Sequence, residues 1–381
     1  GDTIVTSGND VPTANLGAEV IAVQTASAKL FESTVDYPST SFQEILLALL
    51  NLSAFTEQNS HQETPQQVPE PPHSLQSPRK SGRMHQNARR VSHTVGKSRM
   101  QDEELKFVLE KGNELARANL DRLSSLDKEN ISAWRLLSGS LIATSANTAI
   151  SPNLRLQASN YLNSLIFLTM KPREADDDQT RNNVQTRNLL TLKDQITTLY
   201  LSDQVTAKSL PITVIEIHEQ SLEILHNILE QYAETLVDGW SLIFDLISGV
   251  FRGVSKAESG TQLTTPTERR RSALPGGPRL VRAAYKSLHL VASDFLSLLP
   301  SSCLLALVNS FSNFATQKQD FNISLSTTSF FWNVSDFLRG QIEKFSVETH
   351  VDTSVSEEEL GKLARDHDPS VSRNSLWLLL L

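Results

Sequence analysis

Few residues in this sequence have both the types and the spacing that chemistry requires. Gly96-Lys97-Ser98 ends like a phosphate-binding loop, but that loop needs a glycine at position 91, where Val91 stands, and a strand before it. The chain contains no G-x-S-x-G or H-E-x-x-H pattern and no acidic loop with calcium-ligand spacing. These near misses predict neither phosphate-loop nor hydrolase chemistry.

Metal ligands and nucleophiles are equally sparse. Asp176-Asp-Asp178 looks like a carboxylate cluster, but it precedes a predicted helix and is more typical of an acidic helix N-terminus. His218 and His226 are eight residues apart on one predicted helix, a spacing that does not bring them to a common metal. Cys303 lies in an apolar run, which favours packing over reactivity. The sequence therefore predicts no metal site, no cofactor and no enzyme activity.

A cluster of cations is the next chemical feature. No acidic residue occurs between Glu70 and Asp102, and seven basic residues fall in that interval. They are Arg79, Lys80, Arg83, Arg89, Arg90, Lys97 and Arg99. Such residues could contact anionic phosphoinositide headgroups, each contributing about 1 kcal/mol at a membrane surface. The alternative is a solvated linker without a ligand, and a phosphate on Ser92, which follows paired arginines, would weaken any lipid contact.

Composition limits the class of protein. With 35 Lys+Arg against 43 Asp+Glu, the net charge is −8, which argues against nucleic acid as a partner. One cysteine excludes an internal disulfide framework. The apolar fraction of 39% is ample for a core, and no apolar run is long enough to span a bilayer. The chain opens with Gly-Asp-Thr and ends in Trp377-Leu-Leu-Leu-Leu381, and we expect it to be part of a longer protein.

The apolar spacing predicts helices throughout. Residues 1–15 read as a polar leader, 16–56 as a helix pair, 57–100 as a disordered Pro/Gln-rich and then basic linker, and 101–381 as an α-solenoid with a loop at 252–278. Within the last segment helices are predicted at 132–148, 152–170, 177–201, 213–237, 240–251, 279–299, 301–317, 322–345, 356–366 and 370–381. One compact core cannot serve so many successive helices, so the prediction is an all-α, armadillo/HEAT-like solenoid of antiparallel helix pairs. Pro278-x-x-x-Arg282 and Pro369-x-x-x-Arg373 fit the HEAT pattern of an arginine that links neighbouring repeats.

The most specific stretch runs from Phe311 to Phe337. Its second half predicts a helix with Asn322 as N-cap and an apolar stripe of Ile323, Thr327, Phe330, Phe331, Val334 and Leu338. The polar candidates that accompany the stripe are Gln317, Asp320, Asn322, Trp332, Asn333 and Asp336. They form either a hydrogen-bonded ladder between repeats or a partner-binding site.

This stretch resembles the homology-downstream region of the large Arf guanine-nucleotide exchange factors and of their non-catalytic relatives, the MON-two (monensin-sensitivity) family. The resemblance rests on Gln317, Asp320, Asn322-Ile-Ser-Leu325 and Trp332-Asn333-Val-Ser335-Asp336, within a homology-downstream-like region of about 213–345. Arg89-Arg-Val-Ser92 and Ile150-Ser-Pro-Asn-Leu-Arg155 favour the MON-two family in particular. The linker departs from the family and matches nothing in it.

The resemblance implies a non-enzymatic scaffold, peripheral on the cytosolic face of the trans-Golgi network and endosomes, in endosome-to-Golgi vesicle trafficking. It further implies a Dopey-type protein, Arf-like small GTPases and a phospholipid flippase as partners. The alternative is the regulatory region of an active Arf exchange factor. A karyopherin-like transport receptor shares the helical repeats but lacks the Asn322-Ile-Ser-Leu325 and Trp332-Asn333 stretches.

Overall fold

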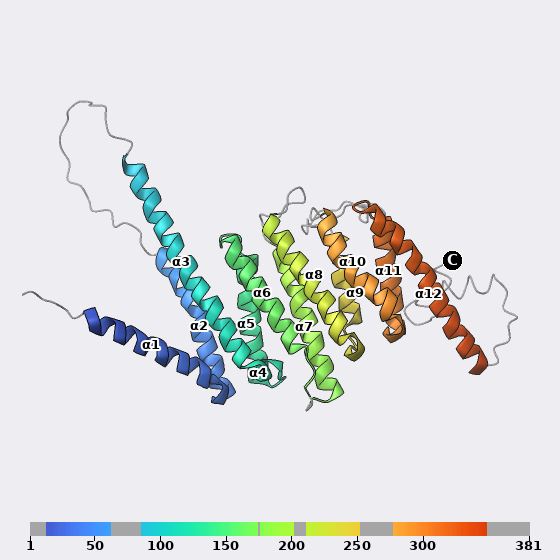
Figure 1. The fold of residues 1–381 in the computed structure, drawn as a ribbon, viewed down its shortest axis with the longest axis horizontal. Coiled ribbons are helices and arrows are strands. Elements are labelled where there is room, and N and C mark those ends of the chain that lie inside the picture. Colours follow the sequence, from blue (N-terminus) through green and yellow to red (C-terminus); the bar gives the residue numbers. More distant parts are fainter. Residues whose placement is uncertain (1–12, 62–84, 174–175, 202–210, 252–276, 349–381) are drawn as a thin grey trace, which may run out of the picture. The chain divides into compact units, whose positions relative to one another are not determined.

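A computed structural model describes residues 13–61, 85–173, 176–201, 211–251 and 277–348. It divides the chain into two compact units, residues 1–137 and residues 138–381. In the described ranges every regular element is a helix (Figure 1), and none of these helices has the length and apolar character needed to cross a membrane. The expected all-α class is confirmed.

The first unit packs two helices against a third. Helices α1 (Thr13–Ser33) and α2 (Ser39–His61), joined by the 3-10 turn η1 (Thr34–Asp36), both contact α3 (His85–Ala118), which α4 (Leu120–Ser124) follows. The core of this unit includes fully buried Phe42, Leu46 and Leu115. The predicted helix pair, α1 and α2, therefore packs against α3 in one unit.

Arg122 fastens the turn between α1 and α2 onto α4. Its guanidinium donates to Ser39 Oγ at 3.1 Å, to the Val35 carbonyl at 2.7 Å and to the Tyr37 carbonyl, and it lies over the Phe42 ring at 5.8 Å. These bonds connect residues more than 80 positions apart in the sequence. Because the fork of an arginine can serve several acceptors at once, one side chain holds the whole turn.

The interval between α2 and α3 is shorter than the linker predicted at residues 57–100. Helix α2 continues to His61 and α3 begins at His85, so the interval 57–100 is helical at both ends, and residues 62–84 lie outside the described residues. The prediction of disorder was too wide because it followed low hydropathy, whereas Gln, Ala, Arg, Lys and Met are good helix formers and no proline occurs between Pro78 and Pro152. Arg89, Arg90, Lys97 and Arg99 stand on α3, while Arg79, Lys80 and Arg83 lie outside the described residues.

The second unit is a two-layer stack. Helix α5 (Lys128–Ala146) crosses the unit boundary and the following helices lie wholly within unit 2. These are α6 (Pro152–Thr169), α7 (Asp178–Leu199), α8 (Ile212–Tyr232), α9 (Trp240–Ser248), α10 (Gly277–Asp294), α11 (Leu304–Thr316) and α12 (Phe321–Glu348). From α6 onward each helix contacts both the next helix and the one after it, which places α6, α8, α10 and α12 in one layer and α7, α9 and α11 in the other (Figure 1). This order of contacts is that of an α-solenoid, as expected, and the armadillo/HEAT repeat type stays a prediction.

The predicted helix boundaries in unit 2 agree with the structure to within a turn or so. Helices α8, α9 and α10 end earlier than predicted, and the 3-10 turns η2 (Ala233–Thr235), η3 (Gly249–Phe251) and η4 (Leu296–Leu298) follow them; a further turn, η5 (Ser301–Cys303), precedes α11. Gly277, at the start of α10, has a φ of 59°, a left-handed conformation that favours glycine. Residues 252–276 of the predicted loop and the helices predicted at 356–366 and 370–381 lie outside the described residues.

Candidate partner-binding surface on α12

The loop between α11 and α12 is a compact hydrogen-bonded turn. Gln317 Oε1 accepts from the backbone N–H groups of Gln319 at 2.6 Å and Asp320 at 2.9 Å, and Gln317 Nε2 donates to the Asp320 carbonyl at 2.5 Å. Asp320 Oδ1 then accepts from the N–H groups of Asn322 at 3.1 Å and Ile323 at 3.4 Å. Gln317 and Asp320 therefore build the start of α12.

The N-cap of α12 is Asp320, and the prediction of Asn322 for this role was wrong. The helix begins at Phe321, one residue earlier than the spacing predicted, so Asn322 already lies in its first turn. A carboxylate suits the position because it accepts two of the free N–H groups and also interacts with the positive end of the helix dipole.

Asp320 also links α12 to its neighbour in the same layer. Arg282 Nε of α10 donates to Asp320 Oδ2 at 2.8 Å. This hydrogen bond is the main reason why the pKa of Asp320 lies below its usual range, with the N–H groups of Ile323 and Asn322 adding to it. The arginine of the Pro278-x-x-x-Arg282 pattern thus contacts the next helix of its layer, as a ladder between repeats requires.

Aromatic rings pack α12 against α10 and α11. Phe330 is buried, with its ring centroid 6.2 Å from that of Tyr285, 5.3 Å from that of His289 and 5.5 Å from that of Phe311. Phe331 meets Phe311 edge to face at 5.6 Å. The predicted stripe is confirmed at Ile323, Thr327, Phe330, Val334 and Leu338, all of which are buried.

The remaining motif residues face away from this core. Trp332 is 73% exposed, and Asn322, Asn333 and Asp336 are exposed as well. Asp336 pairs only with Arg339 of its own helix, at 3.2 Å, among the contacts of the described residues. The structure thus separates the six candidates into a structural pair, Gln317 and Asp320, and four residues displayed on the surface of α12.

A buried polar ladder does exist, but it lies on α7, where the sequence analysis did not place it. Gln185 Nε2 donates to Thr235 Oγ1 at 2.8 Å, Asn188 Nδ2 to Thr169 Oγ1 at 3.0 Å, and Gln195 Nε2 to Ser159 Oγ at 2.7 Å. Asn182 Nδ2 likewise donates to Asp238. These amides recur three to seven residues apart between the apolar residues of α7, a signal that helical spacing could have revealed.

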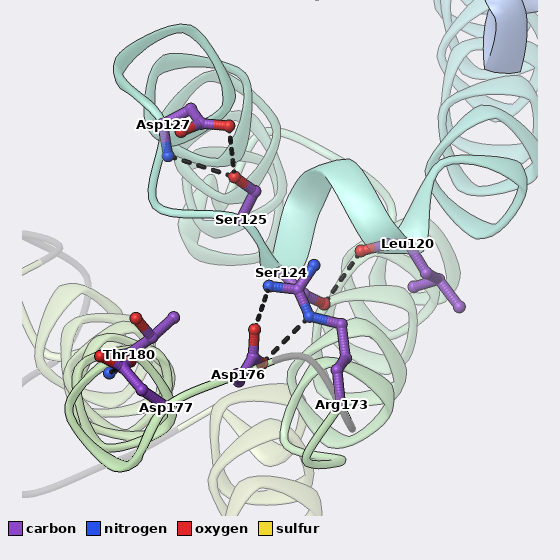
Figure 2. Close-up of polar contacts among 8 residues, drawn as sticks. All are labelled: Leu120, Ser124, Ser125, Asp127, Arg173, Asp176, Asp177 and Thr180. Carbon is purple, nitrogen blue, oxygen red and sulfur yellow. Dashed lines mark hydrogen bonds and ion pairs between the residues drawn. The ribbon is translucent and has the colours of Figure 1, made fainter.

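The acidic run 176–178 has the structural role that the sequence indicated. Asp176 pairs with Arg173 at 2.8 Å (Figure 2). Asp177 is the N-cap of α7 and accepts from Thr180 N at 2.8 Å, and Asp178 pairs with Arg181. In Figure 2, Asp176 faces Arg173, whereas Asp177 lies beside Thr180. No group of three metal-ligating side chains gathers anywhere in the described part of the chain.

The remaining titratable candidates are buried in the stack. His218 Nδ1 lies 2.6 Å from the Tyr200 hydroxyl, and desolvation lowers the pKa of His218 to about 4. Cys303 is buried, and burial raises the pKa of its thiol, which disfavours the nucleophilic thiolate. His226 lies 3.3 Å from Glu230 on the same helix and not beside His218.

The two-layer stack of helices defines the chain as an all-α, solenoid-like protein. Residues 293–380, which include α11 and the displayed residues of α12, match the family model described as the C-terminal region of Mon2 protein. The chain is 27% identical over 69% of its length to the Protein MON2 homolog of Schizosaccharomyces pombe, of which it covers 15%. It is 31% identical over 43% of its length to the human Protein MON2 homolog, of which it covers 9%, and 25% identical over 72% of its length to Protein MON2 of Saccharomyces cerevisiae, of which it covers 18%.

The chain is thus similar to MON2 proteins over much of its length. It spans less than a fifth of the length of these curated relatives. No solved structure matches it.

Proposed function

We propose that the chain is part of a non-enzymatic scaffold in endosome-to-Golgi trafficking, which binds partner proteins through the outer surface of α12. The observation that carries this proposal is the exposure of Asn322, Asn333 and Asp336 on a helix that is held to α10 and α11 by the packing of Phe330 and Phe331. The family match supports it because residues 293–380 include this surface. The proposed setting is the cytosolic face of the trans-Golgi network and endosomes.

The chemistry of this surface suits a protein partner. The side-chain amides of Asn322 and Asn333 can each donate and accept, and the carboxylate of Asp336 accepts, so the surface can pair with backbone and side-chain groups of either kind. Arg339 is the cation beside Asp336, so α12 lacks the clustered positive charge that a lipid surface attracts. The partners proposed from the family resemblance are a Dopey-type protein, Arf-like small GTPases and a phospholipid flippase.

The test compares binding by the intact chain and by Asn333→Ala/Asp336→Ala. Each immobilised protein is incubated with cytosol, captured proteins are identified by mass spectrometry, and each candidate partner is then tested in purified form. The matched control is Asn183→Ala/Asp194→Ala, which removes the same two side-chain types from exposed positions on α7. We expect the α12 variant to lose one of the proposed partners at unchanged melting temperature and the control to retain it. Equal capture by all three proteins would refute the role of α12.

The alternative is that this region regulates an active Arf exchange factor. Nucleotide exchange on a purified Arf protein, catalysed by the full-length parent, would favour that alternative and exclude the non-enzymatic scaffold. Absence of exchange by a parent protein that still captures its partners would support the scaffold.

A contact with anionic lipid is a separate proposal for the basic residues. It is tested by sedimentation with liposomes that contain phosphatidylinositol phosphate, comparing the intact chain with Arg89→Glu/Arg90→Glu/Lys97→Glu. Exchange of charge within α3 leaves the chain length unchanged, so a loss of binding reports charge. Equal sedimentation of both proteins would refute the lipid contact.

A further inference from the structure

We propose that the exposed face of α12 binds the same face of a second copy of the chain, with the two helices antiparallel. The face is built around an apolar ridge of Phe321, Leu325 and Trp332, which are 77%, 61% and 73% exposed. At 100° per residue these side chains project within roughly 40° of one another, so they form one line along the helix. The proposal goes beyond the partner-binding role, because it concerns the assembly of the chain with itself.

The ridge points away from the stack. Helix α12 packs on α10 and α11, and its buried side chains include Phe330 and Val334. These two side chains project roughly 140–180° from the ridge residues. The ridge therefore lies on the open side of α12, and a contiguous exposed apolar surface of this kind is typical of an interaction site.

The large and small side chains of this face are arranged symmetrically. Thr328 and Ser329, which are small and exposed, lie at its centre, and Leu325 and Trp332 each lie about 5 Å from that centre along the helix axis. When two copies pack antiparallel about this centre, Leu325 of one copy meets Trp332 of the other, and the small residues let the helices approach closely. A two-fold contact between identical surfaces requires such self-complementarity.

The two ends of the face are complementary in charge. Asp336 projects within roughly 60° of the ridge residues and is exposed. In the antiparallel pair it lies opposite Phe321 of the other copy, which is the first residue of α12. A carboxylate beside a helix N-terminus interacts favourably with the helix dipole, and the two-fold symmetry provides this contact twice.

The available area suits a weak dimer. The exposed fractions of the three ridge side chains correspond to roughly 400 Å² of apolar surface per copy. A stable interface of standard size buries about 800 Å² per partner, so the ridge supplies about half of that area. Thr328, Ser329 and Asp336 add to it, and we expect association in the micromolar range.

A dimer of this kind would cover Asp336 and leave the polar sector of α12, which consists of Asn322, Ser326 and Asn333, accessible. These three side chains project roughly 70–110° from the direction in which the two helices face each other. Self-association would therefore compete with a partner protein for Asp336 but not for Asn333. This competition rests on the proposed function, whereas the dimer itself does not.

The first test is sedimentation velocity of the intact chain, without any partner protein, from about 1 to 200 µM. We expect the apparent mass to rise towards that of two chains. Leu325→Asp places a carboxylate against Trp332 of the other copy, so it should weaken the association at least about tenfold. Ser326→Asp, a matched charge one residue away in the polar sector, should leave the association unchanged. Circular dichroism of each variant confirms that the stack is folded.

The second test places a single cysteine on α12 in a chain whose Cys303 is replaced by Ala. Ser329→Cys lies beside the two-fold axis, where the thiols of two copies come within reach of a disulfide. Ser326→Cys, the matched control, points roughly 110° away from the other copy. We expect oxidation to link Ser329→Cys chains into dimers at least about tenfold faster than Ser326→Cys chains.

Several outcomes would overturn the proposal. A chain that stays monomeric over the whole concentration range has no such dimer, and if Leu325→Cys is then protected from a maleimide, another part of the same chain covers the ridge. A dimer that Leu325→Asp does not weaken, or equal cross-linking of the two serine positions, would place the contact elsewhere. Because neither test contains a partner protein, their failure leaves the partner-binding role of Asn333 unaffected.

Discussion

Acidification should weaken the second unit through His218. This side chain is buried, and its Nδ1 atom lies 2.6 Å from the hydroxyl of Tyr200, which packs against a core of apolar residues. Burial lowers its pKa from 6.5 to about 4, so the native chain keeps it neutral at a pH where the unfolded chain binds a proton. Because the unfolded state then carries more protons, stability must fall as the pH falls below 6.5.

The size of this effect follows from the two pKa values. At pH 5.0 the unfolded histidine is almost fully protonated and the buried one is almost fully neutral. This pH lies about 1.5 units below the unfolded pKa, and at about 1.4 kcal/mol per unit the unfolding free energy falls by roughly 2 kcal/mol relative to neutral pH. The loss develops between pH 6.5 and about 4 and is complete below the lower value.

The assay is urea unfolding at pH 7.5 and 5.0, followed by circular dichroism. His218→Asn removes the titration while its side-chain oxygen can still accept from the Tyr200 hydroxyl, and His226→Asn on the same helix is the control for a general loss of a histidine. We expect the decrease in stability between the two pH values to be smaller by about 2 kcal/mol in His218→Asn than in the original chain. An identical decrease in both proteins would refute the buried, neutral histidine.

Three further perturbations test the elements that position the α12 surface and the first unit. Phe330→Ala should lower the unfolding free energy by about 3–5 kcal/mol in urea denaturation, since it empties a site among three rings; a loss below about 1 kcal/mol would contradict the packing. Arg122→Lys keeps the charge but cannot make the same set of hydrogen bonds to the turn between α1 and α2, so thermal melting should report about 1–3 kcal/mol of lost stability. An unchanged melting temperature would contradict this role of Arg122. Asp320 has a lowered pKa, so its capping contribution is present above its unfolded pKa and is lost as the pH falls through its folded one. Hydrogen exchange at the first turn of α12 should therefore rise in acid for the original chain, and Asp320→Asn should abolish that rise; the same acid response in both would exclude the cap.

The helices were predictable because apolar spacing reports burial directly. Ile323, Val334 and Leu338 were assigned to the core of α12 from their positions alone, and all three are buried. The N-cap was missed because Asp320 and Asn322 are both good caps, and only the hydrogen-bond geometry shows which of them precedes the first turn. A one-residue ambiguity of this kind is inherent in helix boundaries read from sequence.

The location of the polar ladder could not be predicted in the same way. The motif around Asn333 drew attention because several polar residues accompany an apolar stripe, yet Asn333 and Asp336 are exposed. The amides that do pair in the core, such as Asn188 and Gln195, stand on a helix that reads as polar and unremarkable, and their partners lie on other helices. Helical spacing gives the direction in which a side chain points, but whether that side chain is buried depends on whether another helix packs on that side.

The surroundings of α12 therefore assign different roles to residues that are close neighbours in the sequence. Phe330 is held by α10 and α11, so its substitution reports on folding. Trp332 is a large, exposed aromatic side chain, so Trp332→Ala would change non-specific apolar binding together with any binding to the polar residues beside it. Asn333 lies in the polar sector and pairs with no other helix in the described residues, so its side chain can be removed without disturbing the core. Binding measured on Asn333 and Asp336 variants, and not on Trp332 variants, is the measurement that isolates the partner-binding role.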